Sequence, residues 1–142
     1  MNKLLVAFDG SDNAMRALRY AIALAKEQKT LSLHVVHVHE APLVYGELGL
    51  YITDQKLAEL QRVHSERVLE GAEGVLKDAA VSYSKEILIG PLASTLAQRA
   101  DELGCKGIVL GTRGMSAIGN LVMGSVATKV IHFANMPVTL VK

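Results

Sequence analysis

The chain of 142 residues has no tryptophan and only one cysteine, and it has no apolar run near the length of a membrane-spanning helix. A single cysteine, Cys105, cannot form an internal disulfide, which favours a reducing compartment. Because it stands just before an apolar run, we interpret Cys105 as a small core residue and not as a redox centre. The apolar start of the chain ends at Asp9, too early for a signal peptide. We therefore expect a cytoplasmic protein.

An excess of one charge sign is also missing. Fifteen lysines and arginines face fourteen acidic residues, which gives a net charge of +1, and the two signs are interspersed. Proteins that bind polyanions normally carry a basic stripe, and none is visible here. We therefore expect no nucleic-acid partner and, without a spanning segment, no membrane partner.

What the chain does contain is an alternation of strand and helix patterns. Half of the residues are hydrophobic and the mean hydropathy is +0.27, which is usual for a parallel sheet covered on both faces. We expect strands at 3–8, 31–38, 83–88, 107–110 and 137–141, and helices from about 12, at 55–77, at 92–102 and at about 119–133. This pattern predicts an α/β fold, a Rossmann-like three-layer sandwich in which helices cover both faces of a five-stranded parallel sheet. We expect one domain over residues 1–142.

The most informative segment follows the strand at 107–110. Gly111 and Gly114 come first, and Gly124 and Ser125 then precede a helical pattern. A strand that leads through glycines into a helix is a common phosphate site, because backbone N–H groups can approach an anion closely where no Cβ intervenes. Arg113 adds a positive charge and Ser125 a hydroxyl. The alternative is that these glycines form ordinary turns.

Two further segments should meet this one, because ligands of such sheets bind beyond the carboxyl ends of the strands. Asp9, Gly10 and Ser11 follow the first strand, and residues 38–40 end the second. Asp9 is suited to hold Mg²⁺ or a ligand hydroxyl. Its alternative role is a favourable charge at the start of a helix that Ser11 caps.

Other phosphate and hydrolase motifs are missing. The chain contains no G-x-x-x-x-G-K-[ST] segment, no G-x-G-x-x-G after the first strand and no G-x-S-x-G. These absences argue against a Walker P-loop, a dinucleotide site and a nucleophile elbow, respectively.

The histidines give weaker signals. His37 and His39 should share one face of the second strand and His34 the other, and two histidines at that spacing do not by themselves make a metal site. We interpret His64, among apolar positions of the long helix, as a partly buried packing residue, and His132 as a favourable charge near a helix end. The long connection at 40–53 is either a lid or partner surface, or a flexible crossover.

These motifs together resemble the universal stress protein family. The likeness rests on Asp9-Gly10-Ser11, on His37-Val38, on the glycine spacing described above and on the final Pro137-Val138, and it covers essentially the whole chain. The glycine spacing is similar to that of the nucleotide-binding branch of the family. The resemblance implies strand order 3-2-1-4-5, a homodimer through the last strand, and ATP or another adenine nucleotide as ligand, with Mg²⁺ as a candidate metal at Asp9.

The resemblance also implies roles for particular residues. Adenine and ribose would lie beside Ala7 and Asp9, with the backbone of Val38 against the base. The remaining ligand-lining positions would be Gly10, Ser11, Leu110, Gly111, Arg113 and Gly114 near ribose and phosphates, and Gly124, Ser125 and Val126 around the phosphates. Ala7 stands where many members have proline, and Arg113 and Met115 occupy variable positions, which leaves the preference among ATP, ADP and AMP open.

We expect no catalytic residue, because no base is evident near the expected phosphates. A nucleotide-dependent regulator is the leading interpretation. Two alternatives stay open: a nucleotide-independent dimeric interaction module that uses the dimer face or the connection at 40–53, and a slow ATPase or self-phosphorylating protein.

Overall fold

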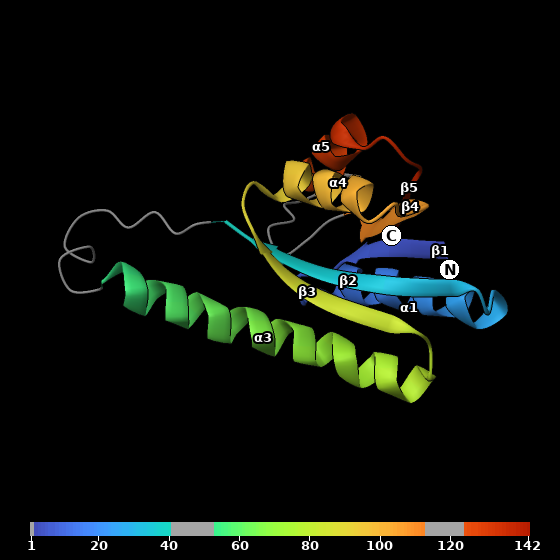
Figure 1. Cartoon of the computed structure of the whole chain (residues 1–142), viewed down its shortest axis with the longest axis horizontal. Coiled ribbons are helices and arrows are strands. Elements are labelled where there is room, and N and C mark those ends of the chain that lie inside the picture. Colours follow the sequence, from blue (N-terminus) through green and yellow to red (C-terminus); the bar gives the residue numbers. More distant parts are fainter. Residues whose placement is uncertain (1, 41–52, 113–123) are drawn as a thin grey trace.

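Strands and helices alternate along the chain in the computed structural model, which describes residues 2–40, 53–112 and 124–142 (Figure 1). The elements are β1 (Asn2–Ala7), α1 (Asp12–Glu27), β2 (Leu31–His39), α3 (Asp54–Ala79), β3 (Tyr83–Ile89), α4 (Leu92–Glu102), β4 (Gly107–Gly111), α5 (Ser125–Phe133) and β5 (Val138–Val141). The expected elements are confirmed with boundaries shifted by at most two residues, except that the last helix begins at Ser125 and not near 119, because Gly124 is extended. Most of the connection at 40–53, the expected helix start near 119, and Arg113, Gly114 and Met115 lie outside the described residues.

The sheet has five strands in the order β3-β2-β1-β4-β5, and every neighbouring pair is parallel. This is the order that the family resemblance implied. The chain winds from β1 toward β3 in one direction, and then crosses over to β4 and β5 on the other side of β1. The carboxyl ends of β1 and β4 therefore form the point where the winding reverses, which is where sheets of this kind bind ligands.

Helices cover both faces of the sheet (Figure 1). Alternate residues of β2 point to opposite faces, so Leu33 and Val35 pack with α1 and α3, whereas Val36 and Val38 pack with α4 and α5. Residues 31–38 of β2 are all buried, which explains why this strand is a nearly continuous apolar run in the sequence. None of the described helices combines the length and apolarity that crossing a bilayer requires.

The long helix α3 differs from its expected packing. Its buried residues are Ser65, Leu69, Ala72 and Leu76, so only the later turns lie fully against the sheet. The earlier turns reach past the end of the strands (Figure 1), and Leu60 is 50% exposed there. His64 lies on this part of the helix and is exposed, so the expectation of a partly buried packing role was wrong. The apolar spacing in the sequence of α3 continues into turns that the sheet does not cover, so the spacing alone overestimates the buried length of this helix.

Candidate functional site

The residues expected to bind a ligand come together at the carboxyl edge of the three central strands. β1 lies between β2 and β4, with Ala7 opposite Val36 and Val6 opposite Val109. The N–H of Phe8 continues this pairing to the carbonyl of Val36 at 2.9 Å. The described members of the expected set at this edge are Ala7, Asp9, Gly10, Ser11, Val38, Leu110, Gly111, Gly124, Ser125 and Val126.

The turn between β1 and α1 is fixed by its own side chains. Asp9 Oδ1 accepts a hydrogen bond from the N–H of Ser11 at 2.9 Å, and Ser11 Oγ accepts one from the N–H of Ala14 at 3.1 Å. Gly10 between them has φ +84°, a conformation that suits glycine. Ser11 is thus the N-cap of α1, as its residue type predicts. The hydrogen bond from Ser11 holds the half-buried Asp9 carboxylate in a defined place at the strand edge.

Thr112, directly after β4, joins three elements. Its N–H donates to the carbonyl of Val141 in β5 at 2.9 Å, and its carbonyl accepts from the N–H of Gly124 at 2.5 Å. Its buried hydroxyl donates to Asn13 Oδ1 of α1 at 3.2 Å. The two residues that flank segment 113–123 are therefore hydrogen-bonded to each other, and both are anchored on the sheet edge.

Gly111 is needed at the end of β4 because of how closely α1 approaches. A Cβ on Gly111 would lie 2.9 Å from Asn13 Cβ and 3.0 Å from Asn13 C. The sequence analysis included Gly111 but missed Thr112 and Asn13. The available signal was a weak helix former, Asn13, inside the apolar face of a helix, where a buried polar side chain requires a partner.

The start of α5 is suited to an anion. Gly124 is its N-cap and supplies no capping side chain, and the first turn contains no acidic residue. The carbonyl of Gly124 accepts from the N–H and hydroxyl of Thr128 at 3.3 and 3.2 Å. The N–H groups of the first helical turn have no partner within the helix, and they carry the positive end of the helix dipole. Ser125, the first helical residue, is exposed beside them.

His37 supports the strand edge from the α3 face. It is buried, and its Nδ1–H donates to the carbonyl of Phe8 at 2.9 Å. Burial lowers its pKa below 6.5, and the nearby His39 and His64 rings lower it further, against the opposing effects of the Phe8 hydrogen bond and Asp9. The ring centroids of His39 and His64 lie 6.5 and 6.3 Å from that of His37. No group of histidine, cysteine or carboxylate side chains in the described part of the chain is arranged to hold a metal ion.

The lowered pKa of His37 predicts a pH dependence of stability. The unfolded chain binds the proton more tightly than the folded one, so stability is complete above pH 6.5 and is lost as the pH falls toward the folded pKa. One such group changes the free energy of unfolding by at most about 1.4 kcal/mol per pH unit. The variant His37→Asn keeps a donor near Phe8 but does not titrate. Urea unfolding between pH 7.5 and 5 should show a shallower pH dependence for the variant, and identical slopes would contradict the assignment.

Comparison with known proteins is consistent with this architecture. The family model described as "Universal stress protein family" matches residues 1–142. Universal stress protein YxiE of Bacillus subtilis is 34% identical over an alignment 147 positions long, gaps included, which covers 99% of each chain. Universal stress protein UspA from Lactobacillus plantarum has the same fold, with a TM-score of 0.85 at 21% identity over 99% of this chain and 97% of that one.

A further solved structure contains a bound ligand. The universal stress protein from Archaeoglobus fulgidus in complex with dAMP is similar with a TM-score of 0.68 and 26% identity, over 100% of this chain and 98% of that one. A protein with a related fold and sequence therefore binds an adenine nucleotide.

Proposed function

This chain belongs to the universal stress protein family, and from that premise we propose that it binds an adenine nucleotide, ATP foremost, and acts as a nucleotide-dependent regulator in the stress response. The observation that carries the proposal is the junction of Thr112 and Gly124 at the uncapped start of α5. It places helix N–H groups at the edge where β1 and β4 end, and Thr112 is also hydrogen-bonded to Asn13 of α1, the helix that follows the Asp9 turn. The dAMP complex of the Archaeoglobus fulgidus relative supports the choice of ligand.

The described residues fit the parts of such a ligand. The start of α5, with Gly124, Ser125 and Val126, would receive the phosphates, because its N–H groups and dipole favour negative charge. The backbone of Val38 and the side of Ala7 would contact adenine, and Asp9 would accept from ribose hydroxyls. The other positions of the proposed site are Gly10, Ser11, Leu110 and Gly111, with Arg113 and Gly114 from outside the described residues.

A divalent cation is part of the same proposal. Mg²⁺ binds proteins through one or two carboxylates and completes its coordination with phosphate oxygens and water. Asp9 offers a carboxylate held at the sheet edge by its hydrogen bond with Ser11. We propose that Asp9 would hold Mg²⁺ together with the phosphates, and the ion would offset their negative charge.

The test is a calorimetric titration of the purified protein with ATP, ADP and AMP in the presence of Mg²⁺, with GTP as the comparison. At ten times its dissociation constant, the ligand should stabilise the fold by about 1.4 kcal/mol and raise the melting temperature by a few degrees. Absence of heat with all three adenine nucleotides would contradict the proposal. Release of ADP and phosphate during the ATP titration would favour the alternative of a slow ATPase.

The variant Ser125→Glu separates ligand binding from folding. A carboxylate in the first turn of α5 interacts favourably with the helix dipole, by about 0.3–1 kcal/mol, so the fold should be as stable as before or slightly more so. The same charge should repel phosphates and abolish binding. Lys129→Gln, at an exposed position of α5 beyond its first turn, is the control, because it changes the net charge by the same −1. Equal nucleotide affinity of the Ser125→Glu variant and the unaltered protein would contradict phosphate binding here.

We also propose a homodimer through β5. Val138–Val141 pairs only with β4 within the described sheet, and all of its residues are half-buried. An apolar edge strand tends to pair with another chain, and a two-fold axis would satisfy both edges at once.

A further inference from the structure

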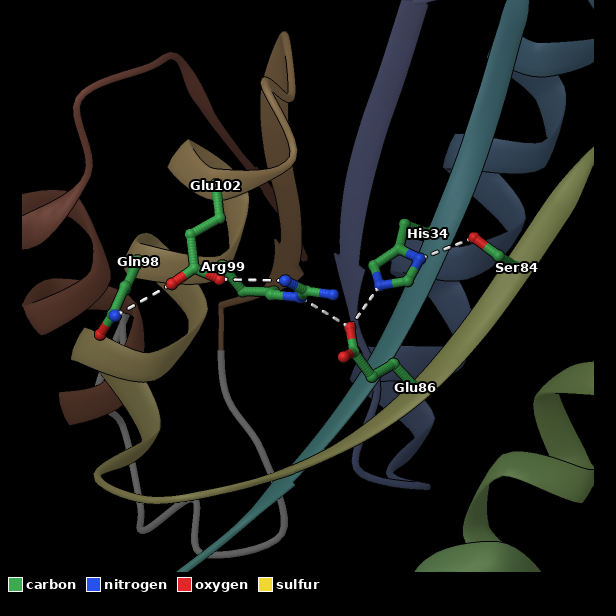
Figure 2. Close-up of polar contacts among 6 residues, drawn as sticks. All are labelled: His34, Ser84, Glu86, Gln98, Arg99 and Glu102. Carbon is green, nitrogen blue, oxygen red and sulfur yellow. Dashed lines mark hydrogen bonds and ion pairs between the residues drawn. The ribbon is translucent and has the colours of Figure 1, made fainter.

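Figure 2 shows a second polar cluster, around His34. His34 and His37 are three residues apart on β2, so they point to opposite faces of the sheet, and His34 is on the face that α4 covers. His34 is buried between β2, β3 and α4, and it stands opposite Ser84 in the parallel register. Its Nδ1 lies 2.6 Å from Ser84 Oγ, and its Nε2 lies 2.7 Å from Glu86 Oε2. Serine, histidine and carboxylate are thus connected in series, through the two nitrogens of one imidazole ring.

The carboxylate determines which ring nitrogen carries the proton. An ionised carboxylate only accepts hydrogen bonds, so His34 Nε2–H donates to Glu86. In the neutral ring, Nδ1 then holds a lone pair that faces Ser84, and the Ser84 hydroxyl donates to it at 2.6 Å. This is the relation between a hydroxyl nucleophile and its general base, with the acid group holding the base in the required tautomer.

Arg99 of α4 keeps Glu86 in this role. Its Nε donates to the same oxygen, Glu86 Oε2, at 2.9 Å, and its Nη1 donates to Glu102 Oε2 at 3.0 Å. Burial acts to raise the pKa of Glu86, but the hydrogen bonds from Arg99 and His34 outweigh it and the pKa is lowered. Gln98 holds the second oxygen of Glu102 at 3.0 Å. The carboxylate that faces His34 is therefore ionised and positioned from two sides.

The charges around His34 can offset the positive charge that a general base acquires during the reaction. Two carboxylates and one guanidinium leave a net charge of −1 while the imidazole is neutral. Transfer of the Ser84 proton to Nδ1 would add a positive charge to this group and would bring the four side chains to neutrality. A buried imidazolium is otherwise costly, and a neighbouring carboxylate reduces that cost.

We propose that Ser84 is a nucleophile activated by His34, and that it becomes acylated by an activated ester or thioester. Ser84 Oγ attacks the carbonyl carbon while His34 Nδ1 takes the hydroxyl proton. The bond from the carbonyl carbon to the leaving group then breaks, and the proton passes from His34 to the departing alkoxide or thiolate. The products are an ester on Ser84 and a free alcohol or thiol, with no change of oxidation state.

The position of Ser84 makes this reaction accessible and separates it from the nucleotide proposal. Ser84 is exposed, on a strand that forms the other edge of the described sheet. It is the second residue of β3, whereas the proposed nucleotide residues lie at the carboxyl ends of the strands. A donor can reach Ser84 from solvent, and no transfer between the two sites is required.

The test is acetylation by p-nitrophenyl acetate, followed by peptide mass spectrometry of the full chain. Ser82, also exposed and two residues earlier, is the internal comparison. Ser84 should be acetylated at least ten times faster than Ser82, and His34→Gln should remove this difference. Lys56→Gln, which removes an exposed charge in the first turn of α3, outside the cluster, should leave the Ser84 rate within about twofold. Equal rates at the two serines would overturn the proposal.

A second measurement applies if His34→Gln does not fold. The variants Ser84→Cys and Ser82→Cys place a thiol at each position, and iodoacetamide reacts with the thiolate. With His34 as the base, the Ser84→Cys protein should be alkylated at pH 7 at least ten times faster than the Ser82→Cys protein. Cys105 is buried, and burial raises its pKa, so its own reaction should be slow. Equal alkylation of the two variants would show that His34 does not activate this position.

Discussion

Replacement of Gly111 by alanine should lower the free energy of unfolding by about 3 kcal/mol, the upper part of the range for overpacked sites. It should also remove the stabilisation by nucleotide. The added Cβ would lie 2.9–3.1 Å from three Asn13 atoms, two of which belong to the helix backbone. A backbone cannot rotate away as a side chain can, so α1 and β4 must separate. That movement would disturb both the Asp9 turn before α1 and the Thr112 anchor after β4.

Gly74→Ala is the matched control for this experiment. Gly74 lies inside α3, and a Cβ there would meet no atom within 4 Å. Alanine is the better helix former, so this variant should be more stable by about 0.5–1 kcal/mol. Urea unfolding with and without ATP measures both effects. If Gly111→Ala were as stable as the unaltered protein and responded equally to ATP, the close packing at Gly111 would have no role in the site.

The fold could be predicted because its signals are local. A continuous apolar run such as β2 indicates a strand buried on both faces, and a capping residue such as Ser11 marks a helix start. The strand order required the family resemblance, since alternation alone does not specify which strands are neighbours. The positions of Asp9 and Gly111 at one edge then followed from the parallel arrangement, because the carboxyl ends of adjacent strands must meet.

Contacts that depend on register or on the reach of the sheet could not be predicted. His34 and Ser84 are fifty residues apart, and they meet only because β2 and β3 pair in one particular register. Thr112 and Asn13 meet because α1 packs tightly on β4. The burial of His64 was predicted wrongly for a related reason. Helical spacing does not show how far a sheet extends beneath a helix, and His64 is exposed. Each case depends on distances between elements, which a single sequence does not contain.

Replacement of Asp9 by alanine should weaken ATP binding by about 10–100-fold, which corresponds to the roughly 1.5–3 kcal/mol of a hydrogen bond to a charged group. Asp9 Oδ1 already accepts from the N–H of Ser11, so the alanine variant also loses part of the turn before α1. A loss of affinity in this variant alone would therefore not separate a ligand contact from a local structural change. Calorimetric titration of each variant gives the affinity, and urea unfolding gives the accompanying change in stability.

Asp9→Asn separates these contributions and tests the metal. Asparagine keeps an oxygen that can accept from Ser11 and from a ribose hydroxyl, but it removes the negative charge that attracts a divalent cation. The unaltered protein should bind ATP more tightly with Mg²⁺ than with EDTA, and the asparagine variant should lose that difference while it keeps its stability. If Mg²⁺ strengthens ATP binding equally in both proteins, the binding of Mg²⁺ does not depend on the Asp9 charge. If the alanine variant binds ATP with unchanged affinity, Asp9 serves only the turn that leads into α1.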